Sequence, residues 1–164
     1  MSVFETALIL ATLLCALTAG LVFAFATVVM PGIATMSDRE YIRAFQVIDG
    51  VIQAGQPVFG LVWMGSLLAV VAAATLSVLQ LDGIIPAMLV IAAASYALGV
   101  QLPTFRVNVP LNNALQALDV DAMDADALAA ARGNFEHRWM RWNTIRTVVA
   151  TLVSATLLVA LLWL

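Results

Sequence analysis

Four long apolar runs, separated by polar segments, dominate the pattern of the chain. The runs are Thr6–Met30, Val58–Leu81, Ile84–Leu102 and Thr144–Leu164. Because a helix needs about 20 mostly apolar residues to cross the hydrocarbon core of a bilayer, these runs have the length of membrane spans. With their flanking helical residues, we expect spans over residues 4–30, 58–81, 84–106 and 137–163. The pattern therefore predicts an all-α fold, an integral membrane four-helix bundle formed by residues 1–164 as one domain.

The connection between the first two runs has a different periodicity. Ser37, with Glu40 three residues later, gives a capping-box pattern at the start of a helix. Apolar residues then recur at helical spacing, at Tyr41, Ile42, Phe45, Ile48 and Ile52. The segment is too polar to span a bilayer, so we expect an additional amphipathic interfacial helix over residues 37–54, lying at the interface or over the mouth of the bundle.

Aspartates are concentrated between the third and fourth runs, at Asp119, Asp121, Asp124 and Asp126. Their spacing lacks the central glycine and terminal glutamate of a calcium-binding EF-hand loop. A short polar helix over 124–132 explains them better, with Asp124 as its N-cap and Gly133 as its end. We therefore expect no metal site here.

The composition supports a membrane location and indicates an orientation. Hydrophobic residues make up 63% of the chain and charged residues 10%, against about 45–50% and about 25% in soluble domains. The chain has no lysine and a net charge of -3, so it offers no basic patch for nucleic acid. All seven arginines fall at 39–43 or 106–146, on the side shared by the first and third connections. By the positive-inside rule that side is cytoplasmic and both termini are non-cytoplasmic, in a plasma membrane, which in a bacterium is the inner membrane.

Two polar stretches lie at the end of the third span and the start of the fourth. The first holds Asn108, Asn112 and Asn113, and the second holds His137, Asn143 and Arg146. Pro110 removes a backbone donor and disfavours helix before it, so we expect a kink or a helix end near the amides. The alternatives are a polar loop at the membrane surface for the first stretch and an interfacial anchor for the second.

In an antiparallel bundle, these two stretches lie at the same membrane face and would form one pocket. Trp139, Trp142 and Phe105 would wall it, together with the substrate-binding amides of Asn108, Asn112 and Asn113. Arg146 and Asn143 would stabilise a developing oxyanion. His137 is the side chain best suited to general-base work near neutral pH, although an exposed histidine at a helix entry is the plain alternative. Such a pocket suits a flat, lipophilic aromatic small molecule with a carbonyl or acidic group.

Both stretches resemble the signature segments of the anthrone oxygenase-like family. They are N-V-P-L-N-N at 108–113 and F-x-x-R-W-x-x-W-N-x-x-R at 135–146. The resemblance implies a small four-helix membrane protein whose site residues are Asn108, Pro110, Asn112, Trp139, Trp142, Asn143 and Arg146. Some members of this family are associated with oxidation of anthrones to anthraquinones by oxygen, without a known cofactor.

Several kinds of chemistry are excluded, and two functions remain open. A single histidine excludes bis-histidine haem, and the chain has no zinc cluster, phosphate loop or nucleophile elbow. We therefore expect no resident cofactor. One hypothesis is an oxygenase acting on a lipophilic aromatic or quinol. The other is a non-enzymatic membrane binding, transport or accessory subunit, in which the Asn, Trp and Arg cluster is structural. Both have membrane lipid as a partner and leave the oligomeric state open.

Overall fold

Helices form all the regular secondary structure of residues 2–164, which the computed structural model describes, and the all-α prediction is confirmed. The first span comprises α1 (Val3–Ala24), a π-helical segment η1 (Phe25–Val29) and α2 (Met30–Ile33). The second is α4 (Pro57–Gln80). The third comprises α5 (Ile85–Tyr96), the π-helical segments η2 (Ala97–Gln101) and η3 (Thr104–Asn108), and α6 (Val109–Gln116). The fourth is α7 (Ala125–Leu162).

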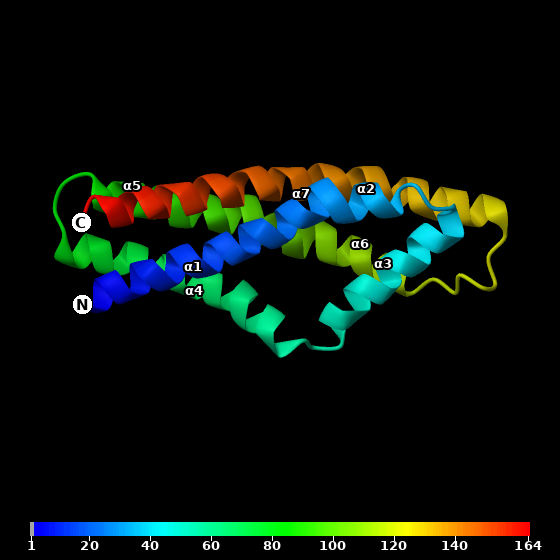
Figure 1. Ribbon diagram of the computed structural model, residues 1–164, viewed down its shortest axis with the longest axis horizontal. Helices are drawn as coiled ribbons and strands as arrows, with labels where there is room; N and C mark the ends of the chain where they lie inside the picture. The colour runs from blue at the N-terminus through cyan, green and yellow to red at the C-terminus, as the bar shows by residue number, and fades with distance from the viewer. Residues whose placement is uncertain (1) are drawn as a thin grey trace.

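The four long segments form an elongated antiparallel bundle (Figure 1). Both termini and the α4–α5 connection lie at one end, and α3 (Asp38–Gln53) and the α6–α7 connection lie toward the other. α1 packs on α4 and α7, and α5 packs on the same two helices. Each of the four segments is long and apolar enough to cross a membrane, so this is an integral membrane protein. The tight α4–α5 turn uses Gly83, whose φ of 85° favours glycine.

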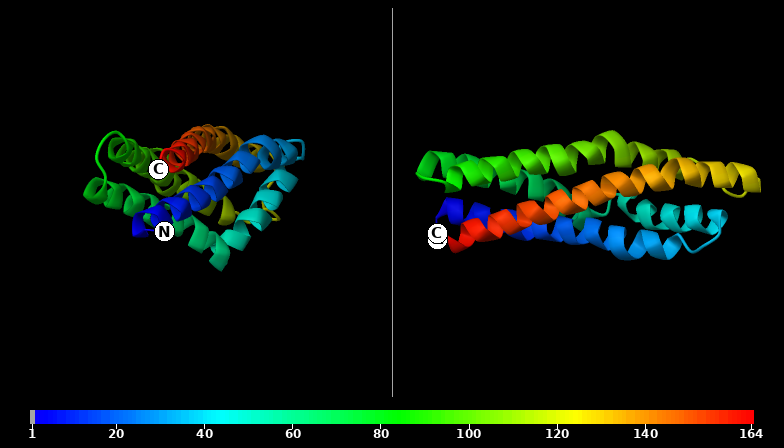
Figure 2. Two further views of the ribbon diagram at one scale, coloured as in Figure 1. Left: turned by 60° about the vertical axis from the view of Figure 1, so that its left-hand side comes forward. Right: turned by 90° about the horizontal axis from the view of Figure 1, so that it is seen from above.

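α3 is the expected amphipathic helix, and it packs lengthwise on the bundle (Figure 2). Ser37 and Glu40 make the predicted capping box. The apolar face of α3 buries Tyr41, Ile42 and Phe45 against α7, where the ring centroids of Phe45 and Phe135 are 4.6 Å apart. The helix therefore covers one end of the bundle, which is one of the two positions expected for it.

The spans continue through three prolines, although the expected first span ends before Pro31 and an end or a kink was expected near Pro110. A π-helical segment immediately precedes each of Pro31, Pro103 and Pro110. In each case the residue before the proline donates its N–H to a carbonyl five residues earlier, as Val109 does to Thr104. Proline inside an α-helix clashes with the carbonyl four residues before it. The wider π turn displaces that carbonyl, so the helix continues past Asn108. Neither the expected helix end nor the alternative of a polar loop is found there.

The fourth span begins earlier than expected, because the helix passes through Gly133. Asp124 is the predicted N-cap and accepts a hydrogen bond from the Ala127 N–H. Glycine inside a helix costs only about 1 kcal/mol. Packing of Leu128 and Phe135 in one apolar cluster on either side of Gly133 outweighs that cost. The predicted separate helix 124–132 is therefore the first part of α7.

Candidate functional site

A cavity of about 230 Å³ lies where α3 covers the bundle. Its apolar walls are largely aromatic and come from α1, η1, α3, α4 and η3: Leu21, Val22, Phe25, Phe45, Phe59, Trp63 and Phe105. Phe105 lines the cavity and is also 52% exposed. Ligand pockets are commonly about 300–1,000 Å³, so this volume suits a small, flat molecule.

Arg146 is a buried cation on the wall of this cavity. Its side chain donates from Nη1 to the Thr104 hydroxyl at 2.9 Å and from Nη2 to the Asn143 Oδ1 at 2.8 Å. Its Nε–H has no hydrogen-bond partner, and no carboxylate among residues 2–164 forms an ion pair with it. The Trp139 ring lies 5.7 Å from the guanidinium carbon. A buried charge without a counter-ion is costly, so this site is suited to an anionic or strongly accepting ligand.

Two fully buried amides fix the surroundings of Arg146. Asn143 donates to the Val22 carbonyl at 3.0 Å, which orients its Oδ1 as an acceptor for the guanidinium. Asn108, 1% exposed, donates to the Trp139 carbonyl at 3.3 Å, and its Oδ1 has no partner. Both amides line the cavity and both are held by backbone atoms of neighbouring helices. The polar wall is therefore preorganised.

A second polar group connects α3 to this wall. The Trp139 indole N–H donates to Asn112 Oδ1 at 2.8 Å, and Asn112 Nδ2 donates to Asp49 Oδ1 at 2.7 Å. Asp49 Oδ2 accepts from Gln53 at 2.6 Å and from Gln116 at 3.3 Å. Asp49 is 5% exposed and lines the cavity. The cavity therefore carries a buried carboxylate on α3 as well as a buried guanidinium on α7.

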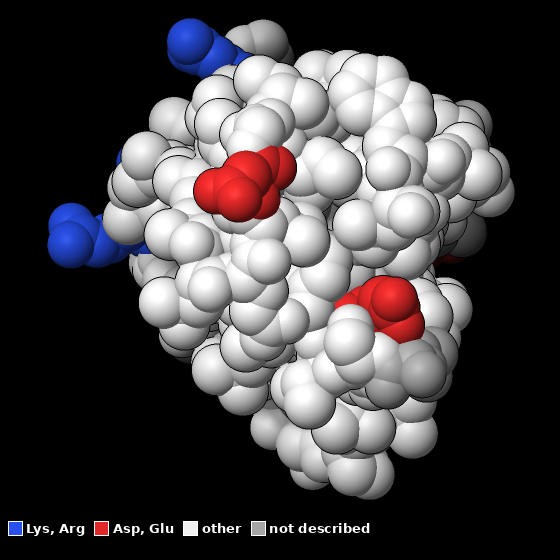
Figure 3. Space-filling view, turned by 90° about the vertical axis from the view of Figure 1, so that its left-hand side faces the viewer, with Lys and Arg blue, Asp and Glu red and all other residues white. Residues whose placement is uncertain are grey.

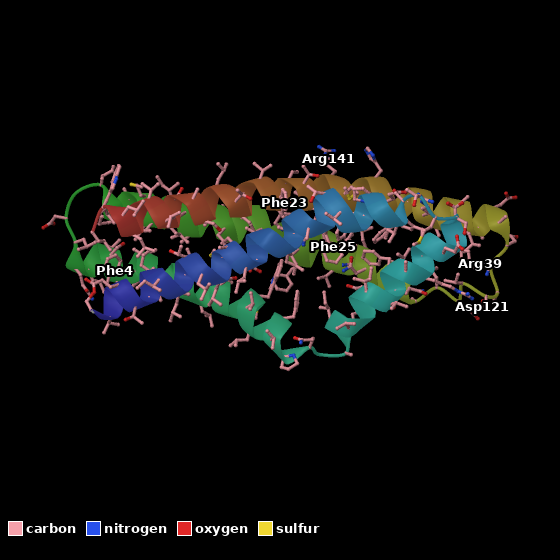
Figure 4. The ribbon with its side chains drawn as sticks, viewed as in Figure 1. Phe4, Phe23, Phe25, Arg39, Asp121 and Arg141 are labelled. Carbon is pink, nitrogen blue, oxygen red and sulfur yellow. The ribbon has the colours of Figure 1, made fainter. Side chains whose placement is uncertain are left out.

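The π-helical segments shape the site from two sides. η1 supplies Phe25, whose side chain points into the interior of the bundle (Figure 4). η3 supplies Thr104, Phe105 and Asn108, three cavity residues within a single wide turn. Segments of π-helix are frequent at functional sites because the extra residue re-aims neighbouring side chains. Here the same segments also accommodate the prolines that follow them.

Most of the residues predicted from the sequence line this one cavity: Phe105, Asn108, Asn112, Asn113, Trp139, Asn143 and Arg146. Two do not. His137 is exposed and lies outside the cavity lining, because two residues before Trp139 on a helix is nearly the opposite face. Trp142 is half-buried and also lies outside the lining. The structure therefore places His137 and Trp142 outside the cavity that the other predicted residues line.

Asp49 is the main functional candidate that the sequence interpretation missed. A signal for it exists in the chain. Asp49 lies four residues after Phe45 and three before Ile52, which places a carboxylate on the apolar face of the amphipathic helix. Thr104 and Trp63, which also line the cavity, carry no such signal because both lie in long apolar runs.

The chain also matches a known protein family. Residues 50–157 match the family described as Anthrone oxygenase, and they include all the cavity residues of α6 and α7. No curated protein and no solved structure matches the chain. The family match covers more than half of the sequence, and the chain therefore belongs to the anthrone oxygenase family.

Proposed function

We propose that this protein is a membrane oxygenase that converts a flat, lipophilic aromatic ketone of the anthrone class to a quinone with molecular oxygen. The observation that carries the proposal is the buried Arg146 guanidinium, which has no counter-ion and lies on an aromatic-walled cavity. The chemistry of an anthrone explains why a guanidinium beside an aromatic-walled cavity would be useful. An anthrone carries an acidic ring CH₂ opposite its carbonyl, and loss of one proton gives an aromatic enolate that reduces oxygen directly.

The reaction balances without a further reductant. One anthrone and one O₂ give one anthraquinone and one water. The enolate transfers one electron to O₂, and the carbon radical and superoxide then combine to form a C–O bond. The resulting hydroperoxide loses the remaining ring proton and its outer oxygen as water, which leaves the second carbonyl. The ring carbon is oxidised and O₂ is reduced by four electrons.

The residues of the cavity have distinct roles in this scheme. Arg146 would stabilise the enolate oxygen, since a preorganised donor in a dry site acts most strongly on charge that develops during the reaction. Asn143 and Thr104 hold the guanidinium in place. Phe25, Phe45 and the other aromatic side chains offer flat apolar surface for the rings.

Oxygen uptake by the purified protein tests the proposal. The folded full chain in detergent, treated with a chelator, should consume one O₂ per anthraquinone formed, faster than the spontaneous reaction and without hydrogen peroxide. Arg146→Met should lower this rate by about 10²–10³, the usual cost of losing one anion-stabilising donor. Arg138→Met is the matched control, because Arg138 is exposed and outside the cavity. No acceleration by the folded wild-type protein would favour the binding or accessory function instead.

We also propose that the cavity end of the bundle lies at the cytoplasmic face of a plasma membrane. The opposite end, which carries both termini, shows two acidic patches, and arginine side chains project only at its edge (Figure 3). Positive residues favour the cytoplasmic side. Reporter fusions after Leu164 and within the α4–α5 turn should both give non-cytoplasmic signals. A cytoplasmic signal at both positions would reverse the orientation.

A further inference from the structure

We propose that Asp49 is the catalytic base that removes the ring proton of the substrate. This inference rests on the proposed function and adds the proton acceptor that the reaction requires. Asp49 and Arg146 line the same cavity from different helices, α3 and α7. A substrate between them would present its CH₂ to the carboxylate and its carbonyl to the guanidinium, because these groups lie at opposite ends of an anthrone.

A comparison of the side chains that line the cavity supports Asp49 as the proton acceptor. Among residues 2–164, Asp49 and Arg146 are the only ones with ionisable side chains that line the cavity, and an arginine is already protonated. His137, the base expected from the sequence, is exposed and lies outside the cavity lining. The carboxylate of Asp49 is therefore the one side chain of the lining able to accept a proton near neutral pH.

The hydrogen-bond partners of Asp49 leave its carboxylate able to accept a proton from a substrate. Its partners are the amides of Asn112, Gln53 and Gln116, and none of these can neutralise its charge. The arginines nearest in sequence have other partners, since Arg39 and Arg43 both pair with Asp121. Arg39 and Asp121 lie together at the far end of the bundle (Figure 4). A carboxylate has about four acceptor positions, and three amide donors leave one for a substrate proton.

Asp49 would act twice in one turnover. It first takes a ring proton, and the C–H electron pair moves to the carbonyl oxygen beside Arg146. After O₂ has bonded to the ring carbon, protonated Asp49 returns that proton to the peroxide oxygen. It then removes the second ring proton as the O–O bond breaks, and the departing hydroxide takes this proton to form water. The carboxylate is thereby restored.

Proton exchange without oxygen isolates this step. Anthrone carrying deuterium at its CH₂ is incubated anaerobically with the full chain in detergent, and deuterium loss to water is measured by mass spectrometry. Wild type should accelerate this loss, and Asp49→Asn should lower the acceleration by at least about 100-fold, the lower range for general-base catalysis. Asp82→Asn is the control, because Asp82 is an exposed aspartate in the α4–α5 turn. Its exchange should equal that of wild type.

Binding of anthraquinone, followed by quenching of tryptophan fluorescence, reports whether the variant is folded. Unchanged exchange in Asp49→Asn that still binds the quinone would overturn the assignment. If Asp49→Asn does not bind it, Asp49→Ser with added formate replaces it. Restoration of exchange by formate supports the assignment, and wild-type exchange without formate overturns it. If wild type and the Asp49→Asn variant are both active, the assignment of Asp49 as the base is refuted and the proposed function is not. If the wild-type protein is folded but inactive, the proposed function itself is refuted.

Discussion

The two ends of the bundle are built in opposite ways. Near the termini, regular α-helices pack through buried aliphatic and small side chains: Leu8, Ala11, Cys15, Val70, Ala73, Leu89 and Leu157. Near α3, the spans contain prolines and π-helical segments, and the buried residues are largely aromatic or polar: Tyr41, Phe45, Asp49, Asn108, Phe135, Trp139, Asn143 and Arg146. The first end follows the packing rules of membrane helices, in which small residues let the helices approach closely. The end near α3 does not follow these packing rules, because its buried residues are largely aromatic or polar.

This difference separates stability from function. Helices in lipid associate mainly by close packing, so the end near the termini holds the four spans together. The cavity end instead carries a charge without a counter-ion and donors and acceptors without partners, at Arg146, Asn108 and Gln101. Such groups lower stability unless a ligand satisfies them. Their presence at one end indicates that this end is shaped for binding.

The largest expected effect comes from replacing the buried charge. Arg146→Met should lower oxygenase activity by about 10²–10³ while leaving stability within about 1 kcal/mol of wild type or raising it. Apolar replacement of a buried ion is often neutral or stabilising, although Thr104 and Asn143 lose a partner. Detergent-titration unfolding and oxygen uptake on the same preparation measure both effects. A loss of several kcal/mol would mean that Arg146 holds the bundle together.

The attachment of α3 should depend on Arg132. This side chain binds the carboxylates of Asp38 and Glu136 and the carbonyls of Ala34 and Met36. We expect Arg132→Ala to destabilise the docked α3 by about 3 kcal/mol, since hydrogen bonds to charged groups contribute about 1.5–3 kcal/mol each and are not additive. Hydrogen exchange of α3 amides should rise, and anthraquinone affinity should fall. Arg141→Ala is the control, because Arg141 projects away from the bundle (Figure 4). If hydrogen exchange of the α3 amides is unchanged in Arg132→Ala, apolar packing alone docks α3.

The same contrast explains what the sequence could predict. The apolar runs report burial in lipid directly, and the Ser37–Glu40 capping box marks the start of α3, so spans and interfacial helix were predicted correctly. The spacing of Asn143 and Arg146 placed them on one helical face, and both are buried there. The prediction failed at Pro31, Pro110 and Gly133, where tertiary packing and π-helical turns overrode local helix-ending signals.

The failure to single out Asp49 from the sequence has a different cause. A helical wheel shows which residues share a face, but it does not show which other helix that face meets. Asp49 lies on the apolar face of α3, and its partners Asn112 and Gln116 lie more than 60 residues away on α6. His137 was favoured because a histidine in this polar stretch suits general-base work near neutral pH. Its separation of two residues from Trp139 nevertheless directs it to nearly the opposite face of the helix.

A smaller effect should distinguish the tight contact between spans from the lipid surface. A Cβ at Gly99 would lie 2.8 Å from Val149 Cγ1, whereas a Cβ at Gly20 would have nothing within 4 Å. Gly99→Ala should therefore destabilise the protein by about 1–3 kcal/mol through overpacking against a stiff, β-branched side chain. Gly20→Ala should stabilise it by up to about 1 kcal/mol, because alanine favours helix more than glycine does. Detergent-titration midpoints that shift in the same direction in both variants would contradict this.

The smallest effect concerns the pH dependence of the α3 cap. Hydrogen bonds from the hydroxyl and then the backbone N–H of Ser37 lower the pKa of Glu40. A carboxyl whose pKa is lower in the folded state stabilises it above its unfolded pKa, and the effect is lost as pH falls through the folded value. Acidification below about pH 4 should therefore loosen the first turn of α3. The measurement is the hydrogen-exchange rate of the first-turn amides in wild type divided by the rate in Glu40→Gln, which lacks the ionisable carboxyl. This ratio should rise toward one on acidification. A ratio that stays constant with pH would show that the cap does not respond to this group.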